Sequence, residues 1–215
     1  MVVVPVLALV VVVVVVAAAA VVVVVVVVLL LLLLLASCQA GASASTAITV
    51  LTTEDAKEKA QKIVEASKAL EAAEVTVEEV KSYYWWAGKV NFDPEWRVAI
   101  TTTAPFSKVE EVVSKAHSYD LPMIIYDLPE RPAESPYWKG LLALGGEEAI
   151  KIAEKLVEKR IVACAQASET SLAVKTVARC KPLVEAQAGQ AVQWSSISGN
   201  EGYLKWLEEE CIGVE

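Results

Sequence analysis

The sequence predicts an α+β protein in which the order β-α-β-β-α-β occurs twice behind an apolar leader. Strand-like and helix-like segments alternate in this order between residues 48 and 128, and the helix-like pattern of 54–65 recurs at 147–158. This order is that of the split βαβ, or ferredoxin-like, plan. We therefore expect two ferredoxin-like units in tandem, at 47–142 and 143–215, with antiparallel sheets and helices on one face.

The leader and its linker occupy residues 1–46. Residues 1–36 are apolar apart from Pro5, and the run 6–36 is long enough to span a bilayer, since about 20 apolar residues suffice. It ends at Ala36-Ser37-Cys38, which suits a signal peptidase or a bacterial lipoprotein signal, although no basic residue precedes Lys57. The alternative is a low-complexity extension without function. We expect a signal or membrane anchor, with a membrane-associated or secretory localisation, or an organelle such as the chloroplast.

The elements of the first unit follow from periodicity and turn chemistry. β-branched residues predict the first strand, and apolar residues at helical spacing, such as Ala56, Ala60 and Ile63, predict the first helix. Asn91 and Pro94 favour a turn between two strands, which makes them a hairpin. The expected elements are a strand at 48–53, a helix at 54–73, strands at 75–90 and 95–103, a helix at 106–117 and a strand at 121–128.

The second unit is shorter because most of the long aromatic hairpin is missing. Three prolines between 129 and 136 predict a hinge before a boundary near Ala143. The expected elements are a helix at 147–158, strands at 161–167 and 172–177, a short helix at 179–187, a strand at 191–197 and a helix at 200–212.

Composition excludes several classes of protein. The 215 residues carry 19 Lys and Arg against 27 Asp and Glu, a formal net charge of −8, which argues against nucleic-acid binding. The four cysteines, at positions 38, 164, 180 and 211, have no C-x-x-C spacing, so neither a zinc knuckle nor a disulfide framework is indicated. His117 is the only histidine, which excludes a three-histidine metal site within one chain.

Six short motifs resemble the CutA family of divalent-cation tolerance proteins. In the first unit, Ser82–Val90 resembles the family's S-x-Y-x-W-x-G-K hairpin, and His117–Ile125 resembles its H-P-Y-x-x-P-x-I-I signature. In the second, Ala153–Ala165 resembles A-x-x-L-V-E-x-R-L-A-A-C, and Gly199–Leu207 resembles G-N-x-x-Y-L-x-W-L. The two remaining motifs are Asp93-Pro94-Glu95 followed by Ile100–Thr103, and Val174-Lys175-Thr176.

The resemblance implies a ferredoxin-like domain that assembles into a tight homotrimer through extended sheets. It also implies a role in metal-ion tolerance, with copper or another divalent ion as the ligand and no established enzymatic reaction. We therefore expect a non-enzymatic, oligomeric protein that binds and responds to divalent, copper-type metal ions.

The candidate metal ligands are His117 and Cys164, one from each unit. The first unit has the family's histidine but Glu71–Ala73 where its cysteine belongs, and the second has Cys164 but Glu185–Gln187 where its histidine belongs. Thiolate and imidazole suit copper or zinc. Glu71, Glu74, Asp120 or a neighbouring subunit would complete the site. Simpler interpretations are a buried core thiol for Cys164 and a helix-end imidazole for His117.

Other interpretations stay open. The aromatic cluster around Tyr83–Trp86 is either a binding platform or, as we expect, hairpin packing and trimer interface. Cys180 and Cys211 lie on predicted helices and are expected to be surface thiols without consequence. An alternative function is a trimeric scaffold tethered at a membrane through residues 6–36, with incidental metal binding. A Cys–His hydrolase or redox enzyme requires an exposed Cys164 within hydrogen-bonding reach of His117.

Overall fold

The computed structural model describes residues 46–70, 72–129 and 135–213. Residues 46–215 form one compact unit, and its proposed division into 47–142 and 143–215 stays a prediction. The elements are β1 (Ile48–Glu54), α2 (Lys57–Ser67), β2 (Ala72–Trp86), β3 (Lys89–Thr102), α3 (Phe106–Ala116), β4 (Ile125–Asp127), β5 (Tyr137–Leu142), α4 (Gly146–Glu158), β6 (Cys164–Ala167), β7 (Leu172–Val177), η1 (Ala178–Cys180), α5 (Lys181–Ala188), β8 (Gln193–Gly199) and α6 (Glu201–Glu210).

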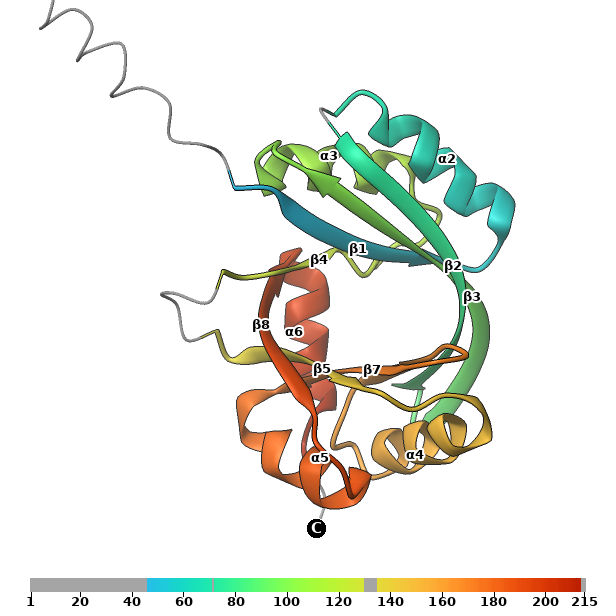
Figure 1. Ribbon diagram of the computed structural model, residues 1–215, viewed down its shortest axis with the longest axis vertical. Coiled ribbons are helices and arrows are strands. Elements are labelled where there is room, and N and C mark those ends of the chain that lie inside the picture. The colour runs from blue at the N-terminus through green and yellow to red at the C-terminus, as the bar shows by residue number, and fades with distance from the viewer. Residues whose placement is uncertain (1–45, 71, 130–134, 214–215) are drawn as a thin grey trace, which may run out of the picture. The chain divides into compact units, whose positions relative to one another are not determined.

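The strands form a single closed antiparallel barrel in the order β1-β3-β2-β6-β7-β5-β8-β4 (Figure 1). The predicted fold class, two ferredoxin-like sheets in tandem, is therefore wrong. Two seams close the barrel: β2 pairs with β6 over Lys81–Tyr84, and β4 pairs with β8 over Ile125–Asp127. These seams give backbone partners to strands that would be the edges of two separate sheets. Residue patterns predict strands, but they do not show which edges meet.

Two local predictions also differ from the structure. The hairpin turns at Ala87-Gly88 and not at 91–94: both residues have positive φ, 53° and 77°, as a two-residue primed turn requires. Asn91–Pro94 lies within β3. The segment after the three prolines, for which the sequence predicted no element, contributes strand β5, which pairs with both β7 and β8.

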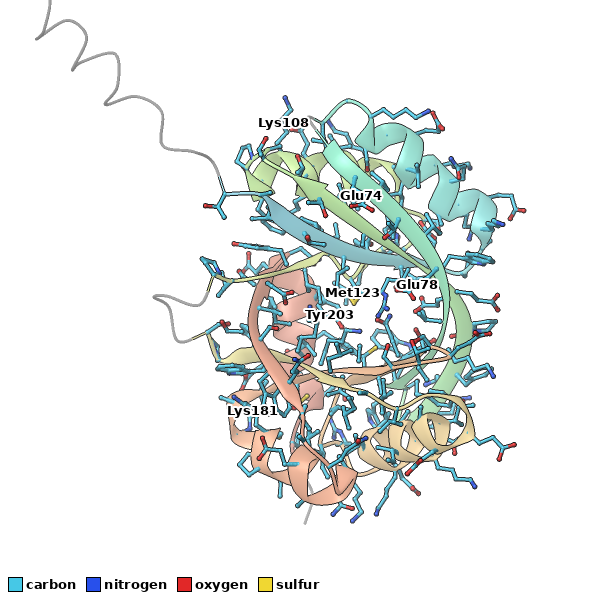
Figure 2. All side chains as sticks on the ribbon, viewed as in Figure 1. Glu74, Glu78, Lys108, Met123, Lys181 and Tyr203 are labelled. Atoms are coloured by element: carbon cyan, nitrogen blue, oxygen red, sulfur yellow. The ribbon has the colours of Figure 1, made fainter. Side chains whose placement is uncertain are left out.

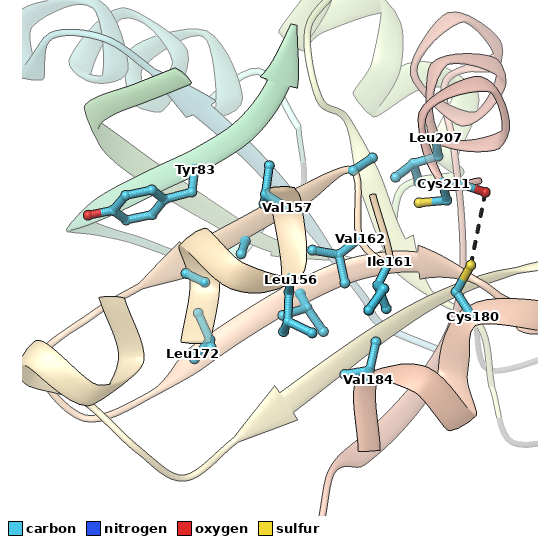
Figure 3. Packing of buried hydrophobic residues seen from close by; sticks show 14 of the residues in the cluster. Tyr83, Leu156, Val157, Ile161, Val162, Leu172, Cys180, Val184, Leu207 and Cys211 are labelled. Carbon is cyan, nitrogen blue, oxygen red and sulfur yellow. Dashed lines mark hydrogen bonds between the residues drawn. The ribbon is translucent and has the colours of Figure 1, made fainter. Parts of the chain in front are cut away.

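Helices α2 and α3 cover the strands of the first half. Their buried residues Ala60, Ile63, Val109 and Val113 share one core cluster with residues of β1 and β3. A larger cluster joins α4, α5 and α6 to the second half, and Figure 3 shows part of it around Leu156, which is fully buried. Truncating such a leucine to alanine costs about 2–5 kcal/mol.

The membrane, secretory or organellar localisation predicted from the leader is corrected here. No helix in the described part of the chain is long and apolar enough to cross a membrane. The segment 6–36, on which the prediction depended, lies outside the described residues. We therefore withdraw that localisation.

Candidate metal centre

His117 follows the last turn of α3, and its side chain has no exposed surface. Its Nε2 lies 3.1 Å from the Thr52 hydroxyl, and its Nδ1 accepts the Tyr119 backbone N–H at 3.1 Å. A neutral imidazole with its proton on Nε2 satisfies both contacts. Burial lowers the pKa of His117, while the charge of Glu54 opposes that shift. Both ring nitrogens therefore already have protein partners.

Glu54 places a buried carboxylate beside this imidazole. Its Oε1 lies 3.2 Å from His117 Nδ1. The Ser118 backbone N–H donates to Oε1 at 2.7 Å, and the Ser118 hydroxyl donates to Oε2 at 2.6 Å. The sequence suggested a helix start here, but Glu54 is the last residue of β1 and fully buried. The imidazole and the carboxylate are two metal-type donors within one cluster.

Cys164 begins β6, and its thiol is buried. Burial raises the pKa of Cys164 to about 11, although the nearby Lys175 ammonium acts in the opposite direction. The hydroxyl of Tyr203, a buried residue of α6, lies beside this thiol. Figure 2 shows Tyr203 between the strands of the first half, β1–β4, and those of the second half, β5–β8. At neutral pH Cys164 is therefore a protonated core thiol, which a metal could bind only by displacing its proton.

A chain of buried polar side chains crosses the β2–β6 seam close to Cys164. Lys175 is fully buried and donates to the side-chain oxygen of Gln166, whose amide donates to Ser82 at 3.3 Å. Ser82 donates to Glu95 at 2.5 Å, and Glu95 also accepts the Tyr119 hydroxyl at 3.0 Å. Because Tyr119 also contacts His117, this network joins the surroundings of both candidate ligands.

Burial lowers the pKa of Lys175 to about 8. Its cross-strand partner on β6 is Cys164, and its partner on β5 is Lys139. Directly opposed residues point to the same side of a sheet. The ammonium therefore favours a thiolate at Cys164, while the positive charge of Lys139 works against the ammonium itself.

The structure does not bring His117 and Cys164 together. Within the described ranges no hydrogen bond joins them, and no group of three or more His, Cys, Asp or Glu residues could hold a metal ion. Of the proposed completing residues, Glu74 and Asp120 are exposed, and Glu71 lies outside the described residues. The arrangement required by a Cys–His enzyme is likewise missing from these residues. Glu54, Lys175 and Tyr203 are the neighbours that sequence reasoning missed.

A cavity of about 540 Å³ lies elsewhere, where β2 leaves its pairing with β6. Acidic residues Glu78, Glu79 and Glu169 line it, together with Lys81 and Gly146 at the start of α4. Neither His117 nor Cys164 lines this cavity. This cavity and the candidate ligands are thus separate features.

The fold and the site define a small antiparallel barrel with an internal polar network and no preformed three-ligand cage in its described part. The family model of the CutA1 divalent ion tolerance protein matches residues 45–139. The divalent-cation tolerance protein CutA of Archaeoglobus fulgidus is 32% identical over 78 residues, which are 36% of this chain and 74% of that protein. The chain belongs to the CutA family.

Solved structures of the same kind show a limited likeness. The periplasmic divalent cation tolerance protein CutA from Archaeoglobus fulgidus has 26% identity over 41% of this chain and 89% of its own, with a TM-score of 0.37. CutA1 from Oryza sativa has 30% identity over 41% of this chain and 83% of its own, with a TM-score of 0.36. The family assignment therefore depends on sequence, and it supports a role in tolerance of divalent metal ions. The second unit as a copy of the first stays a prediction.

Proposed function

We propose that the protein contributes to metal tolerance by binding the metal ion itself, with copper as the first candidate, and without catalysing a reaction. The observation that carries the proposal is membership of the CutA divalent-ion tolerance family. The chain also offers a thiol at Cys164 and an imidazole at His117, which are ligand types that suit copper. We therefore keep these two residues as the proposed ligands.

Each proposed ligand needs a local change before it can bind an ion. His117 has to give up its hydrogen bond with Tyr119 or Thr52, after which Glu54 supplies a second donor 3.2 Å from Nδ1. Cys164 has to lose its proton, which the neighbouring Lys175 ammonium favours. Metal sites of this kind need about four donors. Water or another protomer would supply the rest.

We propose a homo-oligomer, a trimer in the first instance. Trp86 and Phe92, beside the turn of the β2–β3 hairpin, are 51% and 49% exposed. Among the described residues no strand pairs with Glu74–Val80 of β2 on the side away from β3. Exposed aromatic side chains and unpaired strand edges both favour association with another chain.

Copper(II) and zinc titrations of the full chain test the proposal. His117→Gln and Cys164→Ser remove one proposed ligand each, and either should weaken copper binding by at least about tenfold if that residue binds the ion. Glu54→Gln tests the neighbouring carboxylate, with the exposed Glu111→Gln as its matched control. Unchanged affinity in both ligand variants would remove them as ligands. A wild-type chain without saturable binding of either ion would overturn the proposed function.

A further inference from the structure

Two further thiols, expected on the surface, are buried together at the end of α6. Cys180 closes η1, Cys211 follows the last residue of α6, and their exposures are 1% and 0%. The Cys180 Sγ lies 3.9 Å from the Cys211 carbonyl oxygen (Figure 3). The two residues are 31 positions apart in sequence, so the packing of α6 brings them together.

Two arginines hold this end of α6 in place. Arg179 donates to the Cys211 carbonyl at 2.8 Å, and Arg160 donates to the Glu210 carbonyl at 3.1 Å. The Gly213 backbone N–H in turn donates to the Arg160 carbonyl at 2.9 Å. These contacts satisfy carbonyls that the helix end leaves free and place cations where the helix dipole is negative. The position of Cys211 relative to Cys180 is therefore well determined.

Neither thiol has a strong hydrogen bond. The Cys180 thiol contacts the Cys211 carbonyl at 3.9 Å, and the Cys211 thiol contacts the Lys175 carbonyl at 4.0 Å. Thr176 lies beside both thiols, with its hydroxyl donating to the Ile161 carbonyl at 2.6 Å. Leu207 and Val184 belong to the same buried cluster. Two buried sulfur atoms thus lie in the same part of the core, with long contacts to backbone carbonyls.

The pair suits one class of ion. A four-coordinate divalent ion needs more donors, and the described residues contain no group of three or more His, Cys, Asp or Glu that could hold one. Thiolates select soft ions such as copper(I), which accepts two sulfur ligands. We infer that Cys180 and Cys211 together bind one copper(I) ion, as two thiolates that release two protons.

The bound complex carries a net charge of −1, from one monovalent cation and two thiolates. Arg179, which contacts the Cys211 carbonyl and also pairs with Glu208, supplies a positive charge beside the pair. The step changes no oxidation state, because copper arrives already reduced. This site is separate from His117 and Cys164 and extends the proposed function, since it takes a monovalent ion through sulfur alone.

Transfer of copper(I) from its bicinchoninate complex to the reduced full chain, without oxygen, tests the inference. The wild type should take up one more ion than the double variant Cys180→Ser, Cys211→Ser, and Cys164→Ser should retain that ion. Each single variant at these two positions should bind that ion at least about tenfold more weakly, since loss of even an outer partner of a metal ligand costs 10–100-fold. Copper(I) should also raise the Tm of the wild type by more than that of the double variant.

The outcomes separate this site from the proposed one. Equal uptake by the wild type and a double variant that is folded by circular dichroism would overturn the inference. So would a Cys180–Cys211 disulfide that forms without bound copper. Loss of the ion in Cys164→Ser, with retention in the double variant, would refute the copper(I) site and leave the proposed function standing.

Discussion

The two halves of the barrel, 46–129 and 135–213, differ in the donors that they offer to a metal ion. The first half holds the only histidine, buried against the Glu54 carboxylate. The second holds every cysteine of the described residues, Cys164, Cys180 and Cys211, all buried. Imidazole and carboxylate suit harder divalent ions, and thiolate suits soft ones. The two halves thus offer donor types that suit two different classes of metal ion.

The halves also differ in their hairpins, and that difference closes the barrel. β2 and β3 have 15 and 14 residues, whereas β6 and β7 have 4 and 6. The far end of the long hairpin reaches the second half, where β2 pairs with β6. The polar chain from Lys175 to Glu95 crosses the same seam. The long hairpin of the first half therefore supplies β2 as the partner strand of β6 in the second half.

Disrupting the β4–β8 seam should have the largest effect on the free energy of unfolding. A side chain at Gly199 of β8 would place its Cβ 2.3 Å from the Ile124 carbonyl oxygen, which is backbone and cannot easily move. We expect Gly199→Val to lower the free energy of unfolding by about 3 kcal/mol. Urea unfolding measures this. Gly202→Ala is the control, because its Cβ meets only the flexible end of Leu121. Equal stability of both variants would mean that the β4–β8 seam is not closely packed.

Lys175, close to the β2–β6 seam, should make the stability of the folded chain depend on pH. Its pKa is about 8 in the folded chain against 10.5 for an ordinary lysine, so between these values the unfolded chain binds the extra proton. Stability should therefore rise with pH from 8 to 10.5 by up to about 3 kcal/mol relative to Lys175→Met. Unfolding free energies of both chains across this range measure it. The exposed Lys155→Met is the charge-matched control, and a Lys175→Met chain that keeps the full rise would contradict a buried ammonium.

His117 gives the first half its own pH dependence. Burial lowers its pKa, so below about pH 6.5 the unfolded chain takes up a proton that the folded chain resists. Stability from this group is present above pH 6.5 and is lost as the pH falls through the folded pKa. We expect His117→Gln to flatten the acid side of the stability curve, as thermal unfolding between pH 7 and 5 measures. If both chains lost stability equally between pH 7 and 5, His117 would be exposed to solvent in the folded chain and not buried.

The smallest effect is expected at the rim of the cavity. Arg97 of β3 pairs with Glu78 of β2, and the Glu78 side chain is 52% exposed. Exposed ion pairs contribute about 0–1 kcal/mol, and salt screens them. Glu78→Gln should therefore cost less than about 1 kcal/mol, and the cost should shrink further at high salt. A larger, salt-independent loss in chemical unfolding would show that this edge of β2 is structurally essential.

Local patterns predicted most elements but not how they meet. A run of β-branched residues identified β1, and helical spacing identified α3 and α4. β5 was missed because Tyr137–Leu142 follows three prolines and carries Gly140, which allows Trp194 to pack against it. Barrel closure depends on which strand edges pair, and that information is spread over residues far apart in the chain.

The site was predictable only in part, for a similar reason. The motifs identified His117 and Cys164, yet their neighbours Glu54 and Tyr203 come from distant elements and share no local pattern with them. Cys180 stands between Arg179 and Lys181, which suggested an exposed thiol. The turn η1 instead directs it into the core beside Cys211, while Arg179 pairs with α6 and Lys181 lies over the Trp138 ring.

X-ray absorption at the copper edge, on the full chain loaded with copper under reducing conditions, tests most directly whether the second half supplies the ligands. We predict sulfur neighbours around copper in the wild type, and their loss when Cys164, Cys180 and Cys211 are all replaced by serine. A wild-type spectrum with only nitrogen and oxygen neighbours would contradict metal binding through these thiols.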